Sequence, residues 1–195
     1  MASGSTSTIG AVYTVNRSGS EVNFNNCVFR SSYAGICVTS SGGATFGNTN
    51  VKNSIFYSNT NRAANVNSGN LTIINSIVYK NGNTFYRDSE STLTSAYNIF
   101  YGNTSELDNH GSLGIIESDP KFIDLTKSYA LATDSPAINK GNASSSFNDP
   151  DGTRNDIGLY GGPYSWSAGP AITALSISSS SVEQGTAVTI TGTAK

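Results

Sequence analysis

The residues best suited to chemistry lie in the middle of the chain, where a cation, carboxylates and the only imidazole come together. Arg87 and Asp88 are adjacent, and His110 is the single histidine. An arginine can neutralise the carboxylate of a uronate sugar while a base abstracts the neighbouring proton, which is the chemistry of a polysaccharide lyase. A repeat of 22 residues (110 − 88) predicts that Asp88 lies under His110 and that Arg87 lies over Asn65. The alternative is an ordinary solvated surface with an Arg87–Asp88 pair.

Two carboxylates in the same segment suggest a second kind of chemistry. Asp88 and Glu90 alternate, so an extended backbone would aim both side chains to one side. Glycoside hydrolysis needs two acids held about 5 to 10 Å apart across a groove. Nothing in the sequence marks either residue as having a raised pKa, so this signal is weak.

A candidate cation site lies in the aspartate-rich segment 148–156. Asp149, Asp151 and Asp156 stand around a glycine, and oxygen ligands at alternating positions suit a hard cation such as Ca²⁺. The spacing excludes an EF-hand, because an apolar residue would fall at the first ligand position. The alternative is that the aspartates cap a turn while Arg154 pairs with Asp149 or Asp156. No other cofactor is predicted.

The two cysteines, Cys27 and Cys37, have three interpretations. They are small buried side chains, or they form a disulfide in an oxidising compartment. A catalytic thiol is disfavoured because no nucleophile signature surrounds either residue.

A repeat positions all of these candidates. Three segments, 53–59, 75–81 and 97–103, share the pattern Asn-Ser-Ile-(Phe/Val)-Tyr-x-Asn closely and start 22 residues apart (75 − 53 and 97 − 75). A fixed period in the twenties is typical of a solenoid whose units stack as coils. Each coil holds about three short strands between Gly, Asn and Ser turns, and stacking pairs equivalent strands in parallel at ~4.8 Å.

Within the motif, residues of one kind recur at equivalent positions and form ladders. The amides of Asn59, Asn81 and Asn103 fall at a turn, where they are expected to bond the backbone and each other. Neighbouring residues point to opposite faces, so one of two adjacent apolar ladders must lie at a bend or face outward. The sequence leaves open which one does. The two apolar ladders are Ile55, Ile77 and Ile99, and Phe29, Phe56, Val78 and Phe100.

A third ladder consists of Tyr57, Tyr79 and Tyr101. If it faces outward, its rings can stack on sugars, because tyrosine suits glycan contact. If it faces inward, it belongs to the core. The predicted substrate-binding residues are these three tyrosines together with Asn65 and Arg87 of the segment described first.

The composition of the chain changes after the repeats, because all five prolines follow residue 119. Proline breaks strand stacking, so residues 8–118 are expected to form the coils and residues 119–164 an irregular cap over the last coil. A linker, 165–171, is followed by a two-stranded β segment, 172–195, which resembles the opening hairpin of a truncated Ig-like domain. The first coil begins midway, so upstream coils are expected in a longer parent chain.

The composition excludes several classes of partner. Of the 195 residues only 12% are charged and the net charge is −2, which argues against nucleic acid or anionic lipid. No apolar run approaches the ~20 residues that span a bilayer. The abundance of Ser, Thr, Asn and Gly is typical of extracellular or surface β-proteins, although no signal peptide is present in the sequence.

The motif resembles the coils of bacterial right-handed parallel β-helix proteins of the pectin-lyase-like superfamily. Segments 119–124, 129–131, 134–141 and 151–163 resemble, in order, the C-terminal segment of cell-surface choice-of-anchor Q proteins. Asn139 and Gly161 depart from that pattern, since aspartate and glutamate are usual there.

The resemblance implies an all-β, right-handed parallel β-helix in an extracellular bacterial protein. The expected function is to bind or act on a polysaccharide or cell-surface glycan, without a complete active site in this piece. The alternative is a polysaccharide lyase or glycoside hydrolase, since the fold hosts several activities.

Overall fold

The computed structural model describes residues 10–40, 46–105 and 111–165, together with the backbone of 172–177 and 190–194. The chain divides into two compact units, Met1–Ser165 and Trp166–Lys195. The described part of the first unit contains these strands: β1 (Gly10–Asn16), β2 (Glu21–Asn25), β3 (Val28–Arg30), β4 (Ala34–Ser40), β5 (Asn48–Lys52), β6 (Ile55–Tyr57), β7 (Arg62–Asn67), β8 (Asn70–Ile74), β9 (Ile77–Tyr79), β10 (Asn83–Arg87), β11 (Thr92–Ala96) and β12 (Ile99–Tyr101).

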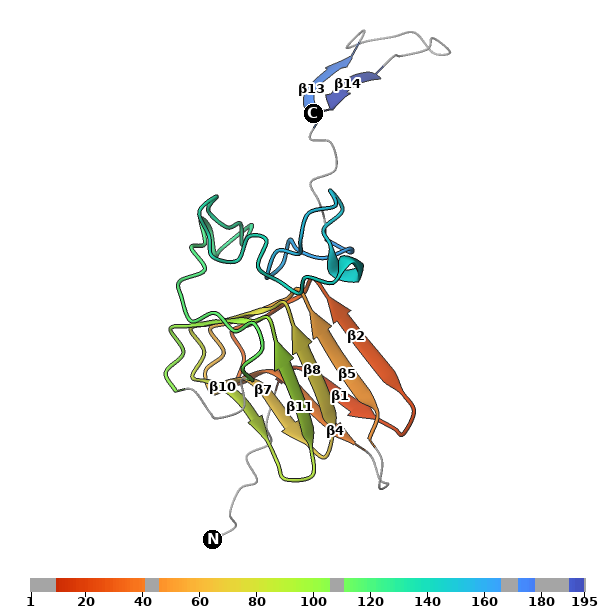
Figure 1. Cartoon of the computed structure of the whole chain (residues 1–195), viewed down its shortest axis with the longest axis vertical. Helices are drawn as coiled ribbons and strands as arrows, with labels where there is room; N and C mark the ends of the chain where they lie inside the picture. Colours follow the sequence, from red (N-terminus) through yellow and green to blue (C-terminus); the bar gives the residue numbers. More distant parts are fainter. Residues whose placement is uncertain (1–9, 41–45, 106–110, 166–171, 178–189, 195) are drawn as a thin grey trace. The chain divides into compact units, whose positions relative to one another are not determined.

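The strands form three parallel sheets, and each coil contributes one strand to each sheet. Sheet A has the order β1-β4-β7-β10, sheet B β2-β5-β8-β11, and sheet C β3-β6-β9-β12. Figure 1 shows the strands of sheet B side by side, with the irregular C-terminal segment beyond their ends. The predicted all-β parallel solenoid is confirmed.

No helix among the described residues is long and apolar enough to span a bilayer, and the only helical element described is a 3₁₀ turn, Ser145–Phe147.

The second unit is described only as a pair of strands. β13 (Ile172–Ile177) and β14 (Ile190–Ala194) are antiparallel, with a register irregularity between Ile172 and Ala174. Most of the predicted linker and the residues between the two strands lie outside the described residues. The Ig-like domain therefore stays a prediction.

The corner between sheets B and C explains the first asparagine of the motif. Asn26, Asn53 and Asn75 have φ of 51°, 48° and 55°, and Tyr97 occupies the same place in the next coil with φ of 54°. This left-handed region is unfavourable for most residues, and asparagine tolerates it better than other non-glycine residues do. The corner then turns the chain sharply from one sheet into the next.

The last asparagine of the motif forms a buried ladder, as predicted. The Asn81 amide nitrogen donates to the Asn103 side chain at 3.1 Å and to the Phe56 carbonyl at 3.0 Å. Its carbonyl oxygen accepts from the side chain and the backbone amide of Asn59, at 2.9 and 3.1 Å. Each asparagine therefore ties its coil to the coils on both sides. The ladder is structural.

Both apolar ladders are buried, for different reasons. The phenylalanine ladder fills the solenoid interior, where the rings of Phe29 and Phe56 stack with their centroids 4.9 Å apart. The isoleucine ladder faces outward from sheet C but is covered by the cap, residues 119–164, through side chains such as Tyr129 and Ile157. The outward ladder that the sequence left undetermined is therefore the isoleucine one.

The cap does not lie over the last coil alone, so that part of the prediction is wrong. The Asn26 side chain in the first coil donates to the Leu159 and Gly161 carbonyls, at 2.7 and 2.9 Å. The Gly158 amide donates to the Asn75 carbonyl in the third coil at 2.8 Å. The cap runs along the B–C corner across several coils because the apolar face it must cover extends along the solenoid. Above the last coil lies residue Ile116, which pairs with Ile99.

Candidate functional site

The register of sheet A gives Arg87 a different neighbour from the one that the 22-residue repeat predicts. Asn65 pairs with Tyr86, and Val66 pairs with Arg87. The prediction that Arg87 lies over Asn65 is therefore wrong. The reason is a local spacing of 21 residues (86 − 65) in sheet A, whereas sheets B and C keep 22, as in Ile77 to Ile99.

Asp88 is a turn-capping carboxylate. Its two oxygens accept hydrogen bonds from the backbone amides of Ser68 and Ser91, both at 2.8 Å. Partial burial alone would raise the pKa of Asp88, but the hydrogen bonds from Ser91 and Ser68 outweigh it and lower the pKa. An ionised carboxylate with both oxygens occupied is a poor proton acceptor. Glu90, the other acid of the predicted pair, is exposed.

Arg87 and Asn65, two of the predicted substrate-binding residues, form hydrogen bonds with different partners. The Arg87 guanidinium is exposed and donates to the Asp88 and Ser91 carbonyls, at 3.3 and 3.4 Å. Asn65 is buried, and its side-chain oxygen accepts from Arg62 at 3.1 Å. His110 lies outside the described residues, so its predicted place beside Asp88 stays a prediction.

Arginine and tyrosine side chains gather on and beside the outward side of sheet A. The Arg62 guanidinium lies over the Tyr86 ring, 4.8 Å from its centroid. Tyr33 immediately precedes β4, and its carbonyl accepts the Arg62 amide at 3.3 Å. Tyr13 and Tyr86 are 61% and 39% exposed. We call this set the tyrosine–arginine surface: Tyr13, Tyr33, Arg62 and Tyr86.

Tyr13 and Tyr86 belong to one lateral row that crosses all four strands of sheet A. Between them stand Cys37 and Asn65, in the register Tyr13–Cys37–Asn65–Tyr86. Three strand spacings place the two tyrosine backbones about 14 Å apart. The two intervening side chains are small and only 2% and 4% exposed, so the exposed area of the row lies at its two tyrosine ends. A ligand that contacts both ends of the row must therefore be elongated.

The cysteines are thiols rather than a disulfide. Cys37 lies in this row, and Cys27 lies just before β3 at the B–C corner. Burial raises the pKa of both thiols, so neither is activated as a thiolate. The interpretation as a small buried side chain fits Cys37, whereas Cys27 is half-buried.

The tyrosine ladder faces outward from sheet C but is only partly accessible. Tyr79 stacks between Tyr57 and Tyr101, with centroid distances of 5.7 and 6.2 Å. The ring of Phe122 in the cap lies 5.4 Å from Tyr79, which is 7% exposed. Tyr101 is 40% exposed and is the accessible end of the ladder.

The aspartate-rich loop uses its carboxylates to hold the cap together. Asp149 accepts from the amides of Gly162 and Asp156, at 2.5 and 3.0 Å, and Asp156 accepts from the Asn139 amide at 2.6 Å. Asp151 accepts from the amide and the hydroxyl of the residue two positions later. Within the described residues, no group of three or more His, Cys, Asp or Glu side chains could hold a metal ion. The alternative, turn capping, is what the structure contains.

Arg154 does not take the role that this alternative gave it. Its Nε donates to the Gly141 carbonyl at 2.8 Å, and one terminal nitrogen donates to the Lys140 carbonyl at 3.3 Å. The guanidinium therefore ties together two cap segments rather than binding an aspartate.

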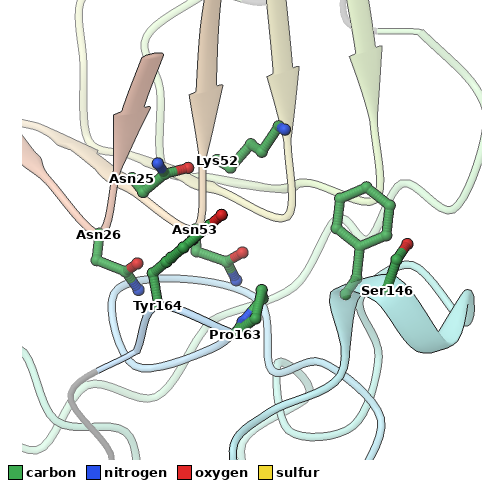
Figure 2. Close-up of a pocket in the computed structure, with 8 residues that line it drawn as sticks. Asn25, Asn26, Lys52, Asn53, Ser146, Pro163 and Tyr164 are labelled. Atoms are coloured by element: carbon green, nitrogen blue, oxygen red, sulfur yellow. The ribbon is translucent and has the colours of Figure 1, made fainter.

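A pocket of about 200 Å³ lies between the B–C corner and the cap. Figure 2 shows Asn25 and Lys52 at the ends of neighbouring strands, with Tyr164 reaching in from the cap. The sequence did not predict this pocket, because residues more than 100 positions apart form it. The only local signal was the pair of polar residues ending β2 and β5. Its lining residues are Asn25, Asn26, Lys52, Asn53, Ser146, Phe147, Pro163 and Tyr164.

Comparison with protein-family models found one family, described as "Right handed beta helix region", which matches residues 6–139. The comparisons with curated proteins and with solved structures each gave no match. The family matches more than half of the chain and covers all twelve strands of the three parallel sheets.

Proposed function

Because the chain belongs to the right-handed β-helix family, we propose that it binds polysaccharide through the tyrosine–arginine surface. We further propose that it is part of a secreted or cell-surface bacterial protein, and that the described residues hold no complete active site. The family supports the scaffold, which pectin-lyase-like proteins share, but a fold alone does not assign an activity.

The observation that carries the proposal is the row with an exposed tyrosine at each end. The rings of Tyr13 and Tyr86 project from the outer strands of sheet A, with small side chains between them. Sugar rings present apolar faces that pack on aromatic rings, and tyrosine adds a hydroxyl that can bond sugar hydroxyls. Two aromatic platforms about 14 Å apart match a chain of linked sugars better than a compact ligand.

Arg62 adds hydrogen-bonding capacity to these platforms. Arg62 is held in place by the Tyr86 ring and by Asn65, so little side-chain entropy is lost on binding. Arg87 does not belong to this surface, because it pairs with the core residue Val66 and its guanidinium bonds the turn after β10. A guanidinium can donate two parallel hydrogen bonds to a carboxylate or to paired oxygens. The surface therefore favours glycans that present several oxygen acceptors.

The proposed extracellular location rests on the cap and the composition. The ordered motifs between residues 119 and 163 support a choice-of-anchor Q type segment, and the low charge of the chain supports a surface protein. Neighbouring domains of a longer chain, including an Ig-like one, are part of the same proposal. Fractionation of the source cell with an antibody to residues 10–165 tests it directly.

Binding is tested by a glycan array, followed by titration of the strongest ligand with the wild type and variants. Tyr86→Ala is expected to weaken binding by about tenfold, the size of one stacking contact of roughly 1.4 kcal/mol. Tyr101→Ala is the matched control, because the two tyrosines are 39% and 40% exposed on different sheets. Loss of binding in the Tyr101 variant alone would move the site to the tyrosine ladder of sheet C.

The catalytic alternative is tested on the same protein by following the unsaturated product that a lyase forms from pectin or alginate. Binding without turnover is expected. Turnover that disappears in Arg87→Ala would overturn the assignment as a binding protein and would support the lyase chemistry that Arg87, Asp88 and His110 suggest.

A further inference from the structure

We infer that the pocket between the B–C corner and the cap is a second binding site, which takes a small ring compound carrying a carboxylate. The inference is independent of the proposed polysaccharide function, since the pocket contains no residue of the tyrosine–arginine surface. It rests on the charge of the pocket, its unpartnered donors, its aromatic walls and its size.

The pocket contains one charged side chain, and that charge is positive. Lys52 is half-buried and lies near the Phe147 ring, 6.0 Å from its centroid. Its ammonium group has no hydrogen-bond acceptor or acidic partner among the described residues. No aspartate or glutamate lines the pocket. An ammonium group without a counter-ion at the edge of a pocket favours an anionic ligand.

Two further polar groups face the same space. Asn25 pairs with Lys52 in register, so the two side chains leave neighbouring strands on the same face of sheet B. Tyr164 approaches from the cap (Figure 2). Neither the Asn25 amide nor the Tyr164 hydroxyl has a side-chain hydrogen bond within the described part of the chain. Ammonium, amide and hydroxyl groups together supply enough donors for both oxygens of a carboxylate.

Apart from Ser146, the cap side of the pocket is formed by rings. Phe147, Pro163 and Tyr164 line the cap side of the pocket, and flat apolar walls favour a flat or puckered ring over a flexible chain. The volume of about 200 Å³ is below the ~300–1,000 Å³ that is typical for drug-sized ligands. The pocket therefore suits a single ring rather than an oligomer.

The floor of the pocket is rigid. The Asn26 side chain is fixed by two cap carbonyls, and the Asn53 side chain is fixed by Asn155 and by the Asp156 carbonyl, at 3.0 and 2.9 Å. These bonds satisfy the corner asparagines and leave Asn25 and Lys52 available. A preorganised floor reduces the entropy lost on binding.

The pocket is confined to the first two coils. In the third coil the position of Lys52 is occupied by Ile74, and the cap bonds directly to the next residue, Asn75, through the amides of Asn142 and Gly158, both at 2.8 Å. An apolar side chain thus replaces the ammonium group at this position of the third coil.

The test is calorimetric titration of the whole chain at low salt with D-glucuronate and D-galacturonate. Glucose and galactose are the neutral matches, and benzoate represents aromatic carboxylates. Lys52→Gln removes the charge and Tyr164→Phe removes only a hydroxyl. Lys127→Gln is the control, because this exposed lysine of the cap makes the same change in net charge outside the pocket.

The ring carboxylates are expected to bind and the neutral sugars to bind at least about tenfold more weakly, the effect of one charged hydrogen bond. Lys52→Gln is expected to cost a similar factor, Tyr164→Phe about threefold, and Lys127→Gln nothing. Preference for uronates over benzoate identifies a sugar acid as the ligand, and the reverse preference identifies an aromatic acid.

Three results would overturn the inference: equal binding of neutral and charged sugars, equal behaviour of Lys52→Gln and Lys127→Gln, or no binding of any ring carboxylate. Circular dichroism establishes that each variant is folded. The Tyr164→Phe variant, which preserves the ring, gives a second test of the same pocket.

Discussion

The buried asparagine ladder provides a sharp quantitative test, through the substitution Asn81→Ala. The Asn81 side chain is 1% exposed and lies in the middle of the ladder, bonded to the coils before and after it. Its removal leaves the Asn59 backbone amide and the Phe56 carbonyl without the bonds that Asn81 provides. Alanine is too small to replace either bond.

Each buried polar group left unpartnered costs about 1–3 kcal/mol. Two such groups, together with the lost bond to Asn103, predict that Asn81→Ala lowers the free energy of unfolding by about 3–5 kcal/mol. Domains of this size are typically stable by only about 5–15 kcal/mol, so the loss is large. The exposed Asn48, whose side chain accepts one bond from Asn70, is the control. Asn48→Ala should change stability by less than about 0.5 kcal/mol.

Urea unfolding followed by circular dichroism measures both variants. Hydrogen exchange of the Asn59 amide adds a local readout, because this amide loses its acceptor in Asn81→Ala. A loss below about 1 kcal/mol, or an Asn59 amide that exchanges as slowly as in the wild type, would refute the view that the ladder holds the coils together.

Two further predictions concern the cap. Ile157→Ala should cost about 2–5 kcal/mol, because Ile157 is fully buried against the isoleucine ladder; the exposed Ile123→Ala should be nearly neutral in the same urea experiment, and equal effects would contradict the packing. Burial raises the pKa of Asp149 and Asp156, whereas the hydrogen bonds from Thr153 lower that of Asp151. In a ¹³C NMR titration the first two should titrate at higher pH than Asp151. A raised pKa in the folded state means that protonation favours folding, so the contribution of Asp149 and Asp156 to stability should grow as pH falls through their titration. Midpoints of Asp149 and Asp156 below that of Asp151 would contradict the prediction.

The parts of the fold that could be predicted are those that repeat. The 22-residue spacing of Ile55, Ile77 and Ile99 is a direct consequence of stacking equivalent residues, and the structure places them in one register. The recurring Asn59, Asn81 and Asn103 predicted a hydrogen-bonded ladder, because a side-chain amide can donate and accept at the same time. Local rules of this kind are visible in a single sequence.

Where a coil departs from the period, sequence projection fails. One residue fewer in sheet A placed Tyr86, rather than Arg87, beside Asn65. A shift of one residue exchanges the two faces of a strand, so the error replaced an outward aromatic ring with its neighbour. The turn at Asp88 restores the spacing, and nothing in its composition reveals the change of length.

The cap and the pocket could not be predicted, because both depend on contacts between distant segments. The bond between Asn53 and Asn155 joins residues 102 positions apart. The prolines indicated where the cap begins but gave no indication of which sheet it covers. The location of the cap decides that Tyr79 is hidden, that Tyr101 is accessible and that Lys52 borders a pocket.

The most direct test of the central claim is the affinity of the whole chain for the strongest glycan of the array, measured for the wild type, Tyr86→Ala and Tyr101→Ala. The tyrosine–arginine surface predicts binding by the wild type and by the Tyr101 variant, and a loss of about tenfold in the Tyr86 variant alone. The absence of binding to any glycan, or equal affinities for all three proteins, would contradict it.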